Sequence, residues 1–324
     1  AGVDLTEFVS GGPPRDGNPP VDDPRFQPVS EEENHSGAEP VVAVALAGET
    51  PRAYPIQILI WHEIVNDEID GRPVTMTYCP LCNSVVAVDA TVVGPDGEDL
   101  ALDFGTSGAL YQSALVMYDR QTESLWTHFD GRAVVGDLLG TELTILAAAM
   151  VSWADAGATF PDALVLDRPT GGLARPYGTA PYPNYETARP SPGYITPEGD
   201  ERLDEKQRVV GIELDGRRVA IDRTALADGE PLGFAVDGRR LVALWEPGTT
   251  SALDGEAIAE GAEVGAVGVV LASLGDRDLT FEPGPEGTIV DRETGSTWNV
   301  LGRSVAGPLA GERLDPVAHL DTFW

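Results

Sequence analysis

The sequence predicts a mainly β protein with a few short helices, built as two tandem homologous β-rich modules (an internal duplication) plus an extended N-terminal arm. Three observations predict this architecture. Val, Ile, Leu and Thr alternate with polar residues in short runs separated by Asp-Gly or Gly-Arg pairs, a pattern typical of strands joined by tight turns. Several of these runs occur twice in the same order. The first part of the chain is instead rich in Pro, Gly, Asp and Glu.

The predicted arm comprises residues 1–40, which contain no hydrophobic period. An ordered segment of this composition must be held either by its own domain or by a neighbouring molecule. Asn34-His35-Ser36 forms a glycosylation sequon in this polar segment, so Asn34 is a predicted glycosylation site.

The repeats divide the rest of the chain into module 1 (41–165), an irregular connector (166–205) and module 2 (206–324). The clearest repeated segments are YDRQTESLW at 118–126 with VDRETGSTW at 290–298, and IDGRPV at 69–74 with VDGRRL at 236–241. We interpret the Asp, Arg and Thr shared by the first pair as a structural turn and ion pair. The connector is rich in Tyr, Pro and Gly, and we expect much of it to pack on the modules because it is too aromatic for a free linker.

Module 1 also contains a predicted helix. Tyr54 and Pro55 open it, since Pro favours the first helical turn. Ile58, His62 and Val65 then fall on one face of that helix.

The charge of the chain is strongly one-sided. The formal net charge is −32 and Lys206 is the only lysine. Such a surface stays solvated when salt screens charge, so we expect a high-salt environment, and it excludes nucleic acid as a partner. No run approaches the ~18 apolar residues of a transmembrane segment. The chain begins at Ala1, and we expect an exported protein after signal-peptide cleavage, or a trimmed sequence.

The residues most indicative of chemistry are Cys79 and Cys82, in the segment CPLCN at 79–83. Strand-like patterns flank this segment, so it is predicted to lie at a turn between strands; a thioredoxin motif lies at a helix N-terminus instead. Asn83 is the best non-glycine residue for the left-handed backbone that would close such a turn. The turn would present two thiolates to one ion, with a disulfide or an inert pair as the alternatives.

Further ligands must come from the four histidines and three methionines. His62 is the predicted third ligand, because it lies on the inward helical face, and Glu63 beside it would orient a neighbouring group. Met117 and His128 compete for a fourth position; Met117 is favoured, and His128 is assigned with Glu63 and Asn83 to the surroundings of the ion. Thiolate, thioether and imidazole ligands favour copper, as Cu(I), with zinc as the alternative.

Module 2 supplies an internal control for this prediction. Aligning the repeats places Glu246 opposite Cys79 and Thr249 opposite Cys82, so module 2 contains no sulfur at this turn. Because the same module is built without the cysteines, a purely structural role for them is disfavoured.

Several of these segments resemble the exported prokaryotic proteins of domain-of-unknown-function family 3179. The matching segments are RAYP at 52–55, WHEIVND at 61–67, YCPLC at 78–82, FGTSG at 104–108, MYDRQT at 117–122 and SLW at 124–126. The family usually has Gly in place of Asn83 and usually lacks a histidine at position 128. The resemblance implies an extracytoplasmic protein and supports His62, Cys79, Cys82 and Met117 as a set, but it implies no reaction.

The sequence therefore predicts an extracellular or cell-surface metal-binding protein, with copper favoured, that acts in metal handling or electron transfer. One alternative is a structural subunit of a surface assembly or filament, a homo-oligomer in which the arm at 1–40 lies on a neighbouring copy. Another is a thiol–disulfide redox protein, which the flanking strands disfavour. Whether the protein is an enzyme is not decided by the sequence.

Overall fold

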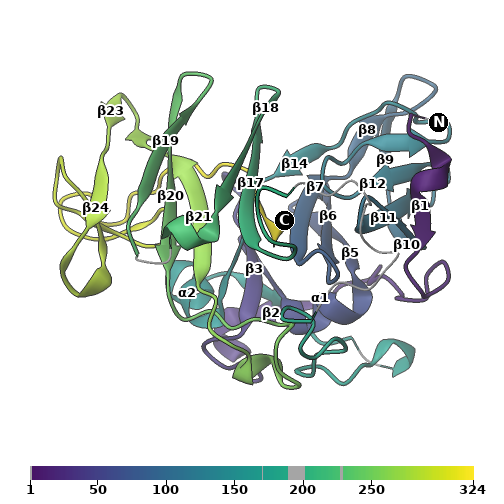
Figure 1. Ribbon diagram of the computed structural model, residues 1–324, viewed down its shortest axis with the longest axis horizontal. Helices are drawn as coiled ribbons and strands as arrows, with labels where there is room; N and C mark the ends of the chain where they lie inside the picture. The colour runs from purple at the N-terminus through teal and green to yellow at the C-terminus, as the bar shows by residue number, and fades with distance from the viewer. Residues whose placement is uncertain (1, 170, 189–200, 227–228) are drawn as a thin grey trace.

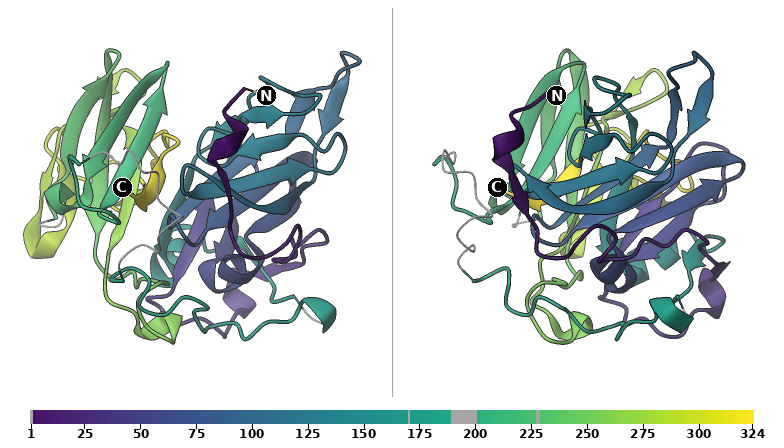
Figure 2. Two further views of the ribbon diagram at one scale, coloured as in Figure 1. Left: turned by 45° about the vertical axis from the view of Figure 1, so that its right-hand side comes forward. Right: turned by 90° about the vertical axis from the view of Figure 1, so that its right-hand side faces the viewer.

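The protein is mainly β. Its structure, a computed structural model, describes residues 2–169, 171–188, 201–226 and 229–324. Within these residues it contains 28 strands and two α-helices. The strands form two lobes, an N-terminal lobe coloured purple to teal and a C-terminal lobe coloured green to yellow (Figure 1; Figure 2, left).

Three larger sheets build the N-terminal lobe. The first contains, in spatial order, β1 (Phe8–Ser10), β10 (Phe104–Tyr111), β11 (Ala114–Asp119), β12 (Leu125–Thr127) and β13 (Ala133–Val135). The second contains β14 (Thr144–Leu146), β7 (Ser84–Asp89), β6 (Arg72–Cys79) and β5 (Ile64–Ile69). The third contains β15 (Ala148–Ser152), β3 (Pro40–Val44), β4 (Arg52–Pro55), β16 (Leu164–Leu166) and β2 (Phe26–Pro28). A small hairpin of β8 (Thr91–Val93) and β9 (Asp99–Ala101) is attached to this lobe.

Smaller sheets build the C-terminal lobe. One contains β18 (Arg217–Asp222), β17 (Arg208–Leu214) and β28 (Leu320–Phe323), and the next contains β19 (Leu232–Val236), β20 (Arg239–Glu246) and β21 (Ala266–Leu271). The others are the pair β22 (Ser273–Leu274) and β23 (Arg277–Asp278), and a sheet of β24 (Phe281–Pro283), β25 (Ile289–Asp291), β26 (Thr297–Trp298) and β27 (Ser304–Ala306).

The sheet that contains β6 is buried on both faces, which positions the two cysteines. Met76 and Tyr78 of β6 point into one apolar cluster, and Cys79 points into another. Because side chains alternate along a strand, this division follows directly from the sequence. The second cluster, which also contains Met117 and Trp126, lies between this sheet and the sheet of β10 to β13.

The two α-helices lie near the ends of strands in the N-terminal lobe (Figure 1). Helix α1 (Ile56–His62) follows Pro55, where the sequence predicted a helix. It ends at His62 because Glu63 adopts φ +60° and ψ −31°, and Val65, predicted on the same helical face, lies in β5 instead. Helix α2 (Trp153–Thr159) was not predicted, although Ser152 caps it by accepting a hydrogen bond from the Asp155 N–H.

The N-terminal segment, purple in the right-hand view of Figure 2, runs along its own lobe. It contributes the strands β1 and β2, which the sequence did not predict. Asp16 N–H donates to Thr106 O (2.9 Å), and the Tyr118 hydroxyl donates to the Asp16 carboxylate (2.5 Å). Gly108 permits this approach, because a Cβ built there would lie 2.4 Å from Pro13 O. The described part of the segment is thus held by its own chain.

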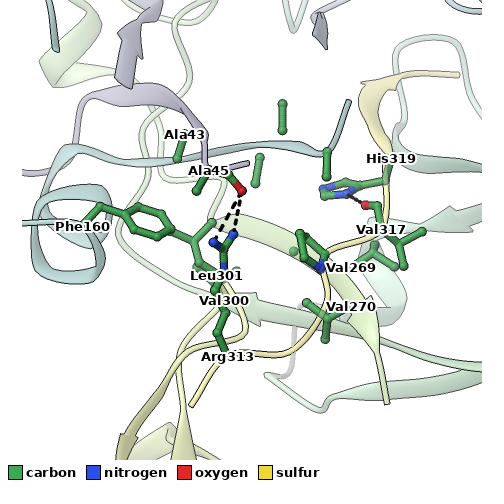
Figure 3. A pocket seen from close by; sticks show the side chains of 15 residues that line it. Ala43, Ala45, Phe160, Val269, Val270, Val300, Leu301, Arg313, Val317 and His319 are labelled. Carbon is green, nitrogen blue, oxygen red and sulfur yellow. Dashed lines mark hydrogen bonds between the residues drawn. The ribbon is translucent and has the colours of Figure 1, made fainter. Parts of the chain in front are cut away.

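A small cavity lies where the two lobes meet (Figure 3). It has a volume of about 30 Å³ and is lined mainly by Ala and Val side chains from both lobes. Arg313 points across it toward Ala45 O, at 3.5 Å, and His319 lies at its other end. A cavity of this size suits a water molecule and not an organic ligand.

Candidate metal centre

The Cys79–Cys82 turn connects two antiparallel strands. Cys79 is the last residue of β6 and pairs with Ser84, the first residue of β7. Asn83 closes the turn in the left-handed conformation that its identity predicted, with φ +49°. Its side-chain oxygen accepts a hydrogen bond from the Tyr78 hydroxyl (3.1 Å). The strand–turn–strand environment agrees with the sequence interpretation and differs from that of a thioredoxin motif.

Three potential metal ligands converge beside this turn. The sulfur atoms of Cys79 and Cys82 and a ring nitrogen of His128 all lie within 4.8 Å of one another. His128 directly follows β12, so it reaches the turn from the opposing sheet. The three residues are 2%, 6% and 1% exposed, respectively, which makes this a closed site within the apolar core.

A chain of hydrogen bonds connects Cys82 to His128. Cys82 Sγ lies 3.0 Å from Ser84 Oγ, and Ser84 Oγ lies 3.2 Å from His128 Nδ1. On the other side of the ring, His128 Nε2 lies 2.9 Å from Thr77 Oγ1. Both imidazole nitrogens are therefore satisfied by hydroxyl groups of the β6–β7 hairpin.

Burial keeps these groups neutral. It raises the pKa of the Cys82 thiol well above its usual range, and the neighbouring Cys79 adds to this while Ser84 opposes it. Burial also lowers the pKa of His128 to about 3. Reactive cysteines occur in exposed, electropositive surroundings that lower their pKa, so Cys82 does not have the character of a redox nucleophile.

The C-terminal lobe covers the turn. The Cys82 carbonyl oxygen accepts hydrogen bonds from the Phe323 N–H and the Thr322 hydroxyl, both at 2.9 Å. The Leu81 carbonyl accepts one from the Tyr185 hydroxyl at 3.0 Å, a residue of the connector. Hydrogen bonds from β28 and from the connector thus hold the backbone of Leu81 and Cys82 in place.

The structure does not bring His62, the predicted third ligand, to the two cysteines. Its Nδ1 lies 2.8 Å from Pro19 O and its Nε2 lies 2.8 Å from the Tyr177 hydroxyl. Both nitrogens are therefore engaged away from the cysteines, and the histidine that joins them is His128, which the sequence assigned only to the surroundings. The Glu63 carboxylate accepts a hydrogen bond from the Asn18 side chain (2.7 Å), and burial raises the pKa of Glu63 to about 7.

The other predicted residues lie as follows. Met117 is fully buried in the apolar cluster that contains both cysteines, on β11 opposite Trp126. Asn34 is exposed, as a glycosylated residue must be, and its modification stays a prediction. His128 carried one signal in the sequence that identifies its place: it comes two residues after Trp126, the last residue of the clearest repeat.

A family model described as a protein of unknown function, DUF3179, matches residues 15–324. The chain belongs to this family. The resemblance inferred from its motifs is thus confirmed, and it extends over both lobes. The chain has no match among curated proteins or solved structures. Of the helices in the described residues, none is long and apolar enough to cross a membrane.

Proposed function

We propose that this DUF3179 protein binds a soft metal ion through Cys79, Cys82 and His128. The observation that carries the proposal is the convergence of two thiols and one imidazole within 4.8 Å, from two sheets that pack face to face. Thiolates and imidazole are the ligands that Cu(I) and Zn(II) prefer in proteins. A buried, apolar surrounding excludes water from such a site and so stabilises Cu(I) against oxidation.

Copper is the favoured ion because of the number of donors. Structural zinc takes four protein ligands. Among the described Cys, His, Asp and Glu residues, three come together here, and Cu(I) is stable with so few soft ligands. Met117, in the same buried cluster, is the proposed source of a thioether if a fourth donor is used.

The second lobe supports a functional role for the cysteines. We infer that the two lobes arose by duplication, since β5–β6–β7 and β19–β20–β21 are both antiparallel meanders, and the Asp119 and Asp291 turns make the same hydrogen bonds. Strand β20 ends in Glu246 where β6 ends in Cys79. A lobe of this kind therefore folds without thiols.

The proposed setting is outside the cytoplasm, in concentrated salt, where the protein would hold or deliver the ion. The net charge of −32 and the single lysine support this setting. Thiol–disulfide exchange is less well supported, because both thiols are almost fully covered. Assembly through the N-terminal segment stays a prediction. It would require this segment to contact a neighbouring copy, whereas the observed contacts are with its own lobe.

The test is anaerobic titration of the reduced, full-length protein with Cu(I) and, separately, Zn(II), against a chelator of known affinity. A single Cu(I) per chain is expected for the wild type, and Cys79→Ser, Cys82→Ser and His128→Gln should each lose it. His319→Gln is the matched control, since it removes a partly buried histidine of the other lobe. Binding that survives Cys82→Ser and His128→Gln together, or no binding by the reduced wild type, contradicts the proposal.

A further inference from the structure

We infer that Thr77 is the positioning residue of this site: it fixes the proton of His128 on Nε2 and so leaves the lone pair on Nδ1 available as a donor, while Ser84 bridges Nδ1 and Cys82 Sγ. The role in metal binding rests on the proposed function. The position of the proton does not, and it is measurable without metal.

The hydrogen bonds of Thr77 determine where the imidazole proton lies. Its hydroxyl donates to Val86 O at 2.9 Å, and a carbonyl oxygen can only accept. The single proton of the hydroxyl is thereby used, so Thr77 Oγ1 can act toward His128 Nε2, 2.9 Å away, only as an acceptor. His128 Nε2 must therefore carry a hydrogen atom. This conclusion holds whether or not Nδ1 is also protonated.

The other ring nitrogen, Nδ1, contacts the hydroxyl group that leads to Cys82. Nδ1 lies 3.2 Å from Ser84 Oγ, which lies 3.0 Å from Cys82 Sγ. In the neutral ring with its proton on Nε2, Nδ1 can accept a hydrogen bond from the Ser84 hydroxyl, whose oxygen also contacts Cys82 Sγ. A ligating histidine normally donates its second N–H to a fixed acceptor, which sets both the tautomer and the ring orientation. Thr77 is such an acceptor, already in place.

The acceptor is held rigidly. Thr77 and Ser84 are both fully buried, and they belong to adjacent strands whose register pairs Thr77 with Val86 and Cys79 with Ser84. All of these side chains therefore project from the same face of the hairpin. The β-branched side chain of Thr77 adds a restricted χ1 angle. The imidazole is thus oriented by the same hairpin that carries the sulfur ligands.

Ser84 has a different role. Its hydroxyl bridges Cys82 and His128 Nδ1, the two groups between which the ion would bind. An ion held by Cys79, Cys82 and His128 Nδ1 would replace the contacts of Ser84 with Cys82 and Nδ1; the two thiol protons would leave to solvent, and no electron would be transferred. Thr77 therefore stabilises the metal-bound state, whereas Ser84 stabilises the metal-free state.

The two residues predict opposite effects on affinity. Thr77→Val, which keeps the shape and removes the acceptor, should weaken Cu(I) binding by about 10–100-fold, the usual cost of losing such a partner. Thr77→Ser should restore it. Ser84→Ala should bind at least as tightly as the wild type. Unchanged affinity in Thr77→Val, or a loss in Ser84→Ala as large as that in Cys82→Ser, overturns the assigned roles.

The tautomer is measured separately, by long-range ¹H–¹⁵N correlation of metal-free protein labelled in its histidines. His128→Gln assigns the His128 signals among the four histidines of the chain. The wild type should show the Nε2–H form alone, and Thr77→Val should gain the Nδ1–H form. An Nδ1–H form in the wild type overturns the inference even if metal binds. If no metal binds but the tautomer is as stated, the proposed function fails and the placement by Thr77 stands. A thermal melt of each variant confirms that it is folded.

Discussion

The two lobes contain equivalent hairpins that differ at one end. β5–β6 and β19–β20 both turn through an Asp-Gly pair with a left-handed backbone. In the first hairpin φ is +49° at Asp70 and +89° at Gly71. In the second it is +47° at Asp237 and +82° at Gly238. The opposite end carries Cys79 in one lobe and Glu246 in the other. Two residues after the repeated Trp, the N-terminal lobe has His128 and the C-terminal lobe has Val300.

These two positions meet in both lobes, which is the instructive part of the comparison. His128 joins Cys79 and Cys82, whereas the Val300 N–H donates to the Glu246 carboxylate at 3.1 Å. The residue that pairs with this strand end also differs between the lobes. Cys79 pairs with Ser84, which contacts the imidazole, whereas Glu246 pairs with Ala266, which has no hydroxyl group. One scaffold thus brings the same two positions together, and the side chains there decide whether thiol and imidazole groups converge.

The largest expected effect comes from building an equivalent set of donors in the C-terminal lobe. Glu246→Cys, Thr249→Cys and Val300→His together supply three soft donors to the C-terminal lobe. We expect Cu(I) affinity at least about 100-fold below that of the native site, because counterparts of the outer partners are missing there. Competition titration in a Cys79→Ser, Cys82→Ser background measures the new site alone. Native-like affinity would show that the donors suffice and that the surroundings contribute little.

The next effect concerns a feature that the two lobes share, the turn built on a buried Asp. The buried Asp119 and Asp291 carboxylates accept hydrogen bonds from the Trp126 and Trp298 indole N–H groups, at 2.9 and 2.8 Å, and from the following Thr. Asp119→Ala and Asp291→Ala should each lower the free energy of unfolding by about 3–5 kcal/mol, since several buried donors lose their acceptor. Urea unfolding followed by Trp fluorescence measures both. A cost under about 1 kcal/mol in either lobe contradicts the shared role.

A smaller effect distinguishes the two lobes by how their stability depends on pH. Burial raises the pKa of Glu246 to about 7 from its ordinary 4.5, and Asp155 adds to this against the Val300 hydrogen bond. The folded state therefore holds a proton that the unfolded state releases, so this residue reduces stability as pH rises from 4.5 to 7, by up to about 3 kcal/mol. Glu246→Gln should be more stable than the wild type at pH 8 and no more stable at pH 4.5.

Thermal melts across this pH range provide the measurement. Glu312→Gln, a change at an exposed glutamate of the same lobe, should behave as the wild type at every pH. His128 acts in the opposite sense in the other lobe. Its lowered pKa means that stability is lost as pH falls below about 6.5, the value in the unfolded chain. A Glu246→Gln melt parallel to that of the wild type from pH 4.5 to 8 would count against the raised pKa.

The smallest effect concerns the turn itself. Asn83→Gly relieves a left-handed backbone but removes the acceptor of the Tyr78 hydroxyl. These contributions oppose each other at about 1 kcal/mol each, so the free energy of unfolding should change by less than about 1 kcal/mol. Chemical unfolding of the metal-free protein tests this. A larger loss would mean that the Asn83 side chain, and not the turn, holds the two cysteines in place.

Much of this molecule follows from local patterns. Alternating residues and Asp-Gly turns predicted the strands around Cys79 and Cys82, and the left-handed Asn83 was predicted from its identity. The histidine that lies beside the cysteines was not the one that the sequence favoured as third ligand. The argument for His62 assumed a helix that continues to Val65, whereas the chain turns at Glu63, a residue type that seldom adopts positive φ. His128 reaches the site only because two sheets pack together, and such packing leaves no period in the sequence.

The bonds from Thr322 and Phe323 to Cys82 also have a consequence for the order of folding. The bond from Thr322 joins residues 240 positions apart in the chain, so closing it costs more conformational entropy than closing a local contact. We expect the hairpin that carries both thiols to form from local contacts, and the thiols to be covered when the sheets of the N-terminal lobe pack, before β28 docks on the Cys82 carbonyl. Until those sheets pack, the two thiols are open to solvent and most exposed to oxidants, so refolding under reducing conditions should give a higher yield of the dithiol form.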